Sequence, residues 1–167
     1  MKRYLSILLI VITVFMLTAC GSTEIKNGKT FTESDFEITL TNDFVKKELS
    51  GIKYYYEDST NGILAIINVE SKQLFENAGI AFPDDAKSYA EFVVKANGLG
   101  VEVNTYKNGD YAQFTYNRSV SGTEYSFYAV TFRSGDNCWL VQFRCNSAKY
   151  NEFVSQFKAW SETVKFK

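Results

Sequence analysis

The sequence predicts an α+β fold, in which a mostly antiparallel sheet of about six to seven strands has helices on both faces. The first observation is a series of segments with alternating apolar and polar residues, separated by short turn signals. The second is a pair of segments with apolar residues at helical spacing. The third is the run Ile63–Val69, which is apolar on both faces and therefore predicts a central strand covered on both sides.

The first half of the chain predicts three strands and a helix. Phe36–Leu40 alternates in polarity, and Ile52–Glu57 forms a second strand before the covered strand at 63–69. Leu74–Phe82 is predicted as either a short helix or a loop. A Pro-Asp-Asp sequence then begins a helix predicted over Asp85–Asn97, because acids favour a helix N-terminus and Asn-Gly favours its end.

The second half predicts a meander and a closing helix. Its four strands are expected at Val101–Tyr106, Tyr111–Asn117, Tyr125–Arg133 and Cys138–Cys145. Asn108-Gly109 predicts the first hairpin turn, because both residues adopt positive φ at low cost. Ser147 is expected to cap the final helix, and Lys165–Lys167 to add a short edge pairing. The helix has one apolar stripe: Tyr150, Phe153, Val154, Phe157, Trp160 and Val164.

The N-terminus has the pattern of an export signal. Lys2 and Arg3 precede an apolar segment, Leu5–Ala19, that would span about 22 Å as a helix. This length is short for a bilayer core of about 30 Å, so a secretory signal is favoured over a permanent span. Leu17–Cys20 resembles the bacterial lipobox, which implies cleavage before Cys20 and acylation of its thiol. The alternatives are an ordinary signal with an incidental cysteine, or an uncleaved anchor.

These features divide the chain into three parts. Residues 1–19 are expected to be a lipoprotein signal peptide, residues 20–30 a lipidated N-terminus with a flexible tether, and residues 31–167 one globular domain. The membrane is then a partner through the lipid on Cys20, and several acyl chains anchor more durably than one. The expected location is the extracytoplasmic face of the cell membrane.

Composition argues against several classes of function. Because residues 1–19 include Lys2 and Arg3 but no acid, the formal charge of −1 falls by two, to −3, after processing. A nucleic-acid partner is not expected, since such binding needs a basic surface. The sequence contains no His, the commonest metal ligand and general base, and we expect no metal, cofactor or catalytic residue.

The domain resembles the PsbP/Mog1-like fold. The resemblance rests on the order of elements and the placement of aromatic residues: the Phe36–Phe44 segment, the Asn108–Tyr111 turn, the two long strands at 125–132 and 138–145, and the closing helix with its tail. Thr41 stands where the family usually has proline. The resemblance implies an α/β/α sandwich and an accessory or binding role without catalysis.

A few residues are candidates for binding. Tyr54 and Tyr56 share one face of a strand and could form a recognition patch, although one face of that strand is expected to be core. Arg118 is a candidate for an anion-binding cluster with Arg133 and Arg144, and the alternative is solvated charge at strand ends. Asp84 and Asp85 could bind a cation, but helix capping explains them more simply.

The cysteines at 138 and 145 are not expected to bond to each other. They are seven residues apart on one predicted strand, which separates them by about 23 Å and points them to opposite faces. A disulfide requires Cα atoms within about 7 Å. Free buried thiols are therefore expected.

Three functions are compatible with these observations. The leading hypothesis is a non-catalytic envelope lipoprotein that binds a protein partner near the membrane. The alternative is a lipoprotein that binds a small hydrophobic or glycan ligand, which the aromatic content of 16% favours. A hydrolase using carboxylates or a Ser-Lys pair is the least supported, because no spacing in the sequence indicates one.

Overall fold

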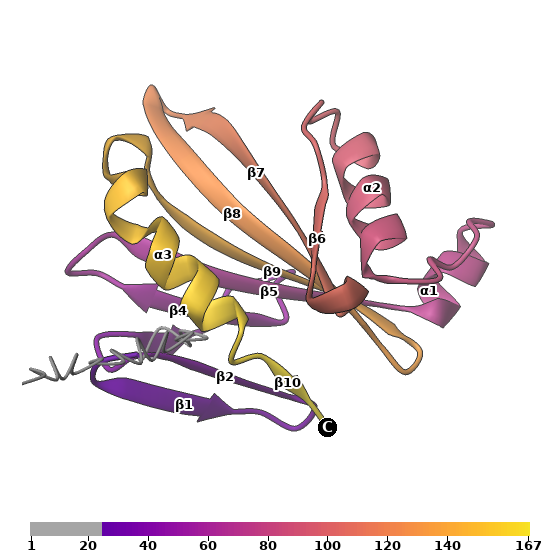
Figure 1. Ribbon diagram of the computed structural model, residues 1–167, viewed down its shortest axis with the longest axis horizontal. Helices are drawn as coiled ribbons and strands as arrows, with labels where there is room; N and C mark the ends of the chain where they lie inside the picture. The colour runs from indigo at the N-terminus through magenta and orange to yellow at the C-terminus, as the bar shows by residue number, and fades with distance from the viewer. Residues whose placement is uncertain (1–24) are drawn as a thin grey trace, which may run out of the picture.

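The computed structural model describes residues 25–167 and contains two antiparallel sheets with three α-helices (Figure 1). The large sheet has the strand order β3-β4-β5-β9-β8-β7-β6, and the small sheet the order β1-β2-β10. The strands of the large sheet are β3 (Val45–Lys47), β4 (Tyr54–Asp58), β5 (Ile63–Ser71), β6 (Asn104–Tyr106), β7 (Tyr111–Val120), β8 (Thr123–Ser134) and β9 (Asn137–Asn146). The other elements are β1 (Gly28–Thr32), β2 (Phe36–Thr41), β10 (Lys165–Phe166), α1 (Lys72–Asn77), α2 (Ala86–Ala96), α3 (Tyr150–Ser161) and the 3₁₀ turns η1 (Lys107–Gly109) and η2 (Ser147–Lys149).

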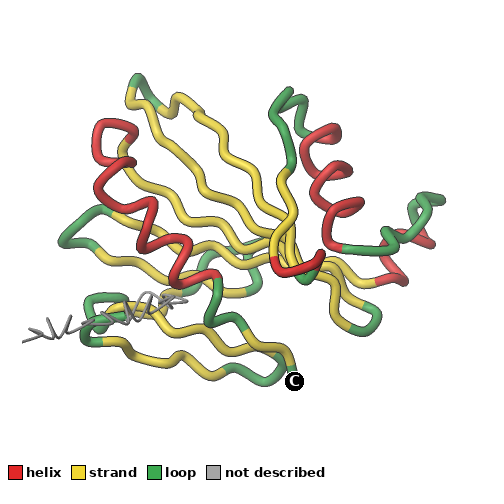
Figure 2. The backbone as a smooth tube through the Cα atoms, in the orientation of Figure 1, coloured by secondary structure: helices red, strands yellow, loops and turns green. Residues whose placement is uncertain are grey.

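Other elements pack on both faces of the large sheet, as the sequence predicts. Helix α3 and the small sheet pack on one face, while α1 and α2 pack on the other (Figure 2). The predicted α+β class and the strand number of the main sheet are confirmed, since this sheet has seven strands and all its pairs are antiparallel.

The core beneath α3 is built mainly from aromatic rings. Phe157 stacks on Phe143 of β9 with ring centroids 5.4 Å apart, and Trp160 lies 5.5 Å from the same ring. Phe36 of β2 stacks on Trp139 at 5.6 Å and so joins the small sheet to the large one. Burial of each large apolar side chain stabilises the fold by about 1.5–3 kcal/mol relative to exposure.

The second core lies between the sheet and helices α1 and α2. Tyr89 and Ala90 of α2 are buried there, together with Phe75 of α1 and Leu140 of β9. The segment predicted as helix or loop thus contains a helix, α1, whose Phe75 side chain packs into this core. The predicted helix at 85–97 is confirmed as α2.

Helix caps fix two of the boundaries. The Asp85 carboxylate accepts a hydrogen bond from the Ser88 amide at 2.7 Å, and the Ser88 hydroxyl accepts one from the Asp85 amide at 3.1 Å. At the last helix the prediction of Ser147 as the cap is wrong. Asn146 caps the preceding turn η2 instead, while the Ser147 hydroxyl is hydrogen-bonded to that of Ser126 at 2.9 Å.

The N-terminal segment departs from the prediction most clearly. The expected tether at residues 20–30 overlaps strand β1, which begins at Gly28 and pairs with β2 along its whole length. The strand predicted at Phe36–Leu40 lies in the separate small sheet and not in the main one. The tail pairing predicted near Lys165 is confirmed, and its partner is β2.

Substituting Phe157 by Ala should lower the free energy of unfolding by about 3–5 kcal/mol, because the ring is fully buried against Phe143 and Trp160. Urea unfolding followed by tryptophan fluorescence measures the change. The matched control is Leu74→Ala, whose side chain is exposed and whose loss should cost less than about 0.5 kcal/mol. A cost below 1 kcal/mol for Phe157→Ala would contradict this description of the core.

Asp85→Ala should cost about 1 kcal/mol at neutral pH, because α2 loses its N-cap. The Ser88 backbone amide, followed by its hydroxyl, holds the pKa of Asp85 below its ordinary value of 3.8. The carboxylate therefore stabilises the fold above pH 3.8, and this contribution is lost as the pH falls through the lower folded value. Urea midpoints at pH 6 and pH 2.5 test this, and an unchanged difference between wild type and variant at both would contradict it.

Candidate functional site

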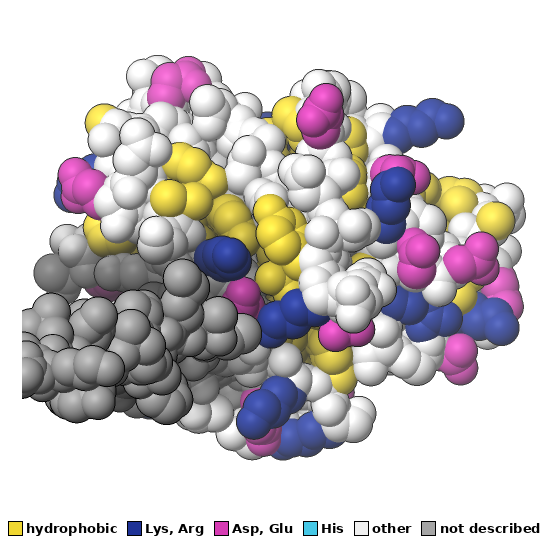
Figure 3. Space-filling model, viewed as in Figure 1, with side chains coloured by type: hydrophobic (Ala, Val, Ile, Leu, Met, Phe, Trp, Pro, Cys, Tyr) yellow, Lys and Arg dark blue, Asp and Glu magenta, His cyan; other side chains and the backbone are white. Residues whose placement is uncertain are grey.

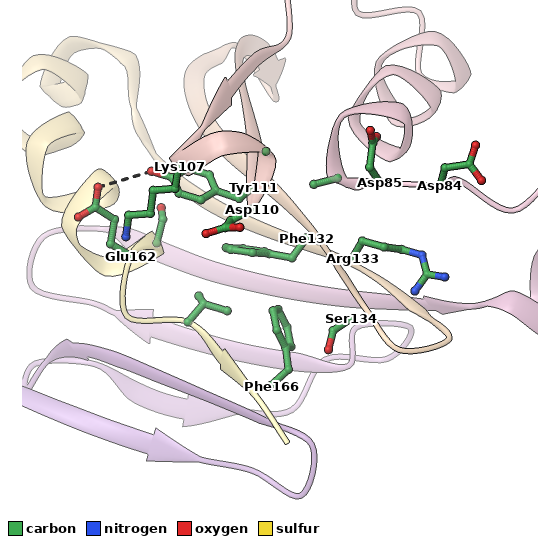
Figure 4. Close-up of a pocket in the computed structure, with 14 residues that line it drawn as sticks. Asp84, Asp85, Lys107, Asp110, Tyr111, Phe132, Arg133, Ser134, Glu162 and Phe166 are labelled. Carbon is green, nitrogen blue, oxygen red and sulfur yellow. Dashed lines mark hydrogen bonds between the residues drawn. The ribbon is translucent and has the colours of Figure 1, made fainter.

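An open groove of about 520 Å³, which we call the main groove, is the candidate site (Figure 4). It lies where the start of α2, the turn η1, the end of β8 and the C-terminal tail meet. Four segments that are far apart in the sequence supply its walls, so no single motif could have indicated it.

Aromatic rings form the floor of the main groove. Tyr111 of β7 lies 5.7 Å from Phe132 of β8, and Phe132 lies 5.3 Å from Phe166 of β10, all between ring centroids. Behind them, Tyr106 stacks on Tyr111 at 5.4 Å. The antiparallel pairing of β6, β7 and β8 sets this row, because Tyr106, Tyr111 and Phe132 are opposite one another in register.

The Tyr111 hydroxyl is held as a proton donor. It points to Glu162, at the end of α3, with 3.5 Å between the oxygens. Burial, and then the negative charge of Glu162, raises the pKa of Tyr111 to about 12. The phenol therefore stays protonated at neutral pH and is suited to hydrogen bonding, not to acid–base chemistry.

Charged side chains form the rim, and acids outnumber bases among them. Lys107 and Arg133 provide the positive charge, and the acids are Asp84, Asp85, Asp110 and Glu162. Arg133 is fixed in place, because its Nε donates to the Pro83 carbonyl at 3.2 Å and its guanidinium lies 4.1 Å from the Phe82 ring. Asp84 and Asp110 are exposed and hydrogen-bonded to no side chain within residues 25–167.

The groove is suited to binding. Its buried Ser161 hydroxyl donates to the Phe157 carbonyl at 2.6 Å and is not placed beside a general base. Within the described part of the chain, no group of three or more Cys, Asp or Glu side chains could hold a metal ion. An aromatic floor with a charged rim is instead the usual composition of a protein-binding surface.

A smaller hollow of about 330 Å³ adjoins the groove between α3 and β6. Figure 3 shows apolar side chains gathered in this region. Its lining includes Tyr106, Tyr128 and Tyr150, and the pKa of Tyr128 and of Tyr150 is raised by burial. Tyr106 lies between the hollow and the main groove, since it lines the first and stacks on the floor of the second.

The structure places Tyr54 and Tyr56 in the core, not on an exposed recognition patch. Tyr56 is fully buried and Tyr54 nearly so, because their shared face of β4 is covered by the small sheet. Their hydroxyls donate to carboxylates on the β1–β2 hairpin: Tyr54 to Asp35, and Tyr56 to Glu33 at 2.8 Å. These two tyrosines hold the small sheet on the large one.

The three arginines do not form one cluster. Arg133 lies on the rim of the main groove, at the end of β8 next to Pro83. Arg118 of β7 is exposed and lies at the other end of the sheet, as does Arg144 of β9. The two cysteines point to opposite faces as predicted, since Cys138 belongs to the core under α2 and Cys145 to the core under α3.

Cys20 and the signal segment at 1–19 lie outside the described residues. From residue 25 onward, none of the helices is both long enough and apolar enough to cross a membrane. The sequence did not indicate that the residues of the main groove lie together. It did predict the Asn108-Gly109 turn and the tail pairing, which bring Tyr111 and Phe166 together.

Comparison with known proteins supports the fold. No protein-family model matches the chain, and a search of curated proteins finds no significant match. The solution structure of cyanobacterial PsbP from Synechocystis sp. PCC 6803 is similar with a TM-score of 0.58 at 12% identity, over 90% of this chain and 99% of that one.

Two crystal structures show the same similarity. The Ran-binding protein Mog1p of Saccharomyces cerevisiae has a TM-score of 0.58 at 9% identity, over 83% of this chain and 95% of that one. A protein from Bacteroides thetaiotaomicron has a TM-score of 0.57 at 15% identity, over 84% of this chain and 49% of that one. None of these descriptions names an enzymatic activity, and identities this low support the fold alone. The domain therefore has a PsbP/Mog1-like fold.

Proposed function

We propose that this chain is a membrane-anchored envelope lipoprotein whose domain has a non-catalytic accessory role and binds a partner protein in the main groove. The single observation that supports partner binding best is the composition of that groove, a row of three aromatic rings bordered by exposed charges of both signs. The PsbP/Mog1-like fold is compatible with an accessory role.

The anchor part of the proposal rests on the N-terminal sequence. A positive pair, a short apolar segment and the Leu-Thr-Ala-Cys motif ending at Cys20 occur in the order and at the distances of a bacterial lipoprotein signal. Eight peptide links separate Cys20 from Gly28, the first residue of β1. Even fully extended, such a segment reaches only about 29 Å, so the partner would be met close to the bilayer.

Replacing Cys20 by Ala should release the protein from membranes. The variant can accept no acyl chain, so the fraction of mature protein that sediments with membranes should fall. The missing protein should appear in the soluble extracytoplasmic fraction or remain as uncleaved precursor. Fractionation with immunoblotting measures this, and Ser22→Ala is the matched control with an intact lipobox. Wild-type levels of a cleaved Cys20→Ala protein on membranes would contradict the anchor.

Reversing two rim charges, Asp84→Lys with Asp110→Lys, should weaken capture of the partner at least tenfold. Both side chains are exposed, so stability should change by less than about 1 kcal/mol while the charge pattern of the main groove is inverted. The measurement is crosslinking in intact membranes followed by affinity purification and mass spectrometry.

The matched control for this experiment is Asp43→Lys with Glu48→Lys, which makes the same charge change at exposed positions away from the groove. One protein should be recovered in constant ratio from wild type and control, and at much lower yield from the rim variant. Equal recovery from all three, or recovery of none, would contradict partner binding in this groove.

A further inference from the structure

The face of the large sheet that lies opposite α3 has a second surface, which the proposed function does not use. Helices α1 and α2 cover only part of that face, where Phe114, Ala129 and Leu140 pack beneath them. Beyond the helices the register places Arg144 of β9 between Leu64 of β5 and Phe127 of β8. We call this uncovered region the open sheet face, and its members are Leu64, Tyr116, Arg118, Tyr125, Phe127, Gln142 and Arg144.

Aromatic rings make up much of the open sheet face. Tyr116 and Phe127 are opposite in register and stack with centroids 4.6 Å apart and planes only 5° from parallel. Phe127 belongs to neither core, although only 9% of it is exposed, because its neighbours on this face cover it. Tyr116 is only partly buried, and its ring can stack against the apolar face of a ligand ring.

Two arginines flank these rings without a carboxylate partner. The Arg144 guanidinium lies 4.2 Å from the Tyr125 ring centroid, and that of Arg118, opposite Tyr125 in register, lies 5.9 Å from the Tyr116 ring. All ion pairs found within residues 25–167 involve lysine, so neither guanidinium is neutralised. A ring-stacked guanidinium keeps its N–H edge free for a bidentate contact with a carboxylate or phosphate.

Arg144 also has an unsatisfied donor. Its Nε is buried and has no hydrogen-bond partner in the described structure, which is uncommon and costly for a buried polar atom. The acid facing it across Leu64 is Glu57, but that carboxylate is bonded to Lys47 at 2.6 Å and to Ser59 at 2.9 Å. Lys47, Glu57 and Arg144 together therefore carry a net positive charge, which an anion on this face would meet.

A hollow of about 260 Å³ lies beside Arg118, between the sheet and the C-terminal end of α2. Its lining includes Arg118 and Tyr116 together with the amide side chains of Asn68 and Gln142. The Gln142 Nε2 donates to the Tyr116 hydroxyl at 2.7 Å, which leaves the Gln142 oxygen and the Tyr116 proton available to a ligand. The hollow is smaller than typical pockets for drug-sized ligands, which begin near 300 Å³, and suits a group the size of one sugar ring.

We propose that the open sheet face binds an acidic saccharide, meaning a sugar that bears a carboxylate or phosphate group. Arg118 and Arg144 bind the anionic group, the Asn68 and Gln142 amides bind hydroxyls, and the Tyr116 ring stacks on the apolar face of the sugar. The arginines alone would fit any anion, and the amides beside an aromatic ring select one with many hydroxyls. This site is separate from the main groove and does not depend on the proposed function.

The full-length protein, in a detergent without a sugar headgroup, should bind glucuronic acid and glucose 6-phosphate in a calorimetric titration at low salt. Glucose should bind at least tenfold more weakly, because it lacks the charged group, and inorganic phosphate likewise, because it lacks the ring. A galacturonate oligomer that binds more tightly than its monomer would identify a polymer as the source, and equal binding would identify the free sugar.

Arg118→Gln should weaken binding of glucuronic acid about tenfold or more and leave the weak binding of glucose unchanged. The side chain is exposed, so this variant folds even if Arg144→Gln does not. Lys87→Gln, an equal charge change on α2, is the matched control and should bind as wild type does. The double change at Asp84 and Asp110 should also leave this binding intact, which separates the site from the main groove.

Three results would overturn the proposal. They are equal affinity for glucose and glucuronic acid, equal affinity of Arg118→Gln and Lys87→Gln for glucuronic acid, and no binding of either acidic sugar up to about 10 mM.

Discussion

Strand β9 is the element on which the rest of the structure depends, because its two faces belong to two different cores. Trp139, Val141 and Phe143 point to the layer of α3 and the small sheet, while Cys138 and Leu140 point to the layer of α1 and α2. A strand buried on both sides cannot be stable until both layers are in place, since either bare face would expose a row of large apolar side chains. The stability of each layer therefore depends on the other, because both pack on β9.

The two layers cover the sheet unequally, and this difference creates both candidate surfaces. On one side the small sheet is held by aromatic stacking and by hydroxyl-to-carboxylate bonds, and the Thr163 hydroxyl links the end of α3 to β2 at 2.9 Å. That layer is nearly complete, so only its border with β6 and η1 is left as a groove. On the other side α1 and α2 cover only part of the sheet. The remainder is occupied by stacked aromatic rings and arginines, which tolerate water better than aliphatic chains do.

The sequence predicted the elements well and their assembly less well, for physical reasons. Alternation and helix signals are local, so β8, β9 and α2 could be located within a few residues. Pairing partners are not local, which is why Phe36–Leu40 was placed in the main sheet and the groove of Tyr111 and Phe166 was not foreseen. The alternation at Tyr54 showed which residues share a face but not which face is covered. Asn146 and Ser147 are adjacent and both can cap a helical turn. The prediction was one residue off, because Asn146 is the residue that caps η2.

The placement of Cys138 and Cys145 determines how the domain responds to oxidising conditions. Each thiol is fully buried in a different core, and burial raises the pKa of each to about 11. Because the thiolate is the reactive form, neither sulfur is open to oxidation while its layer stays closed, and the fold needs no oxidant to form. Each thiol can also be used as a chemical probe for the opening of its own layer. Modification of Cys138 records opening beneath α2, and modification of Cys145 records opening beneath α3.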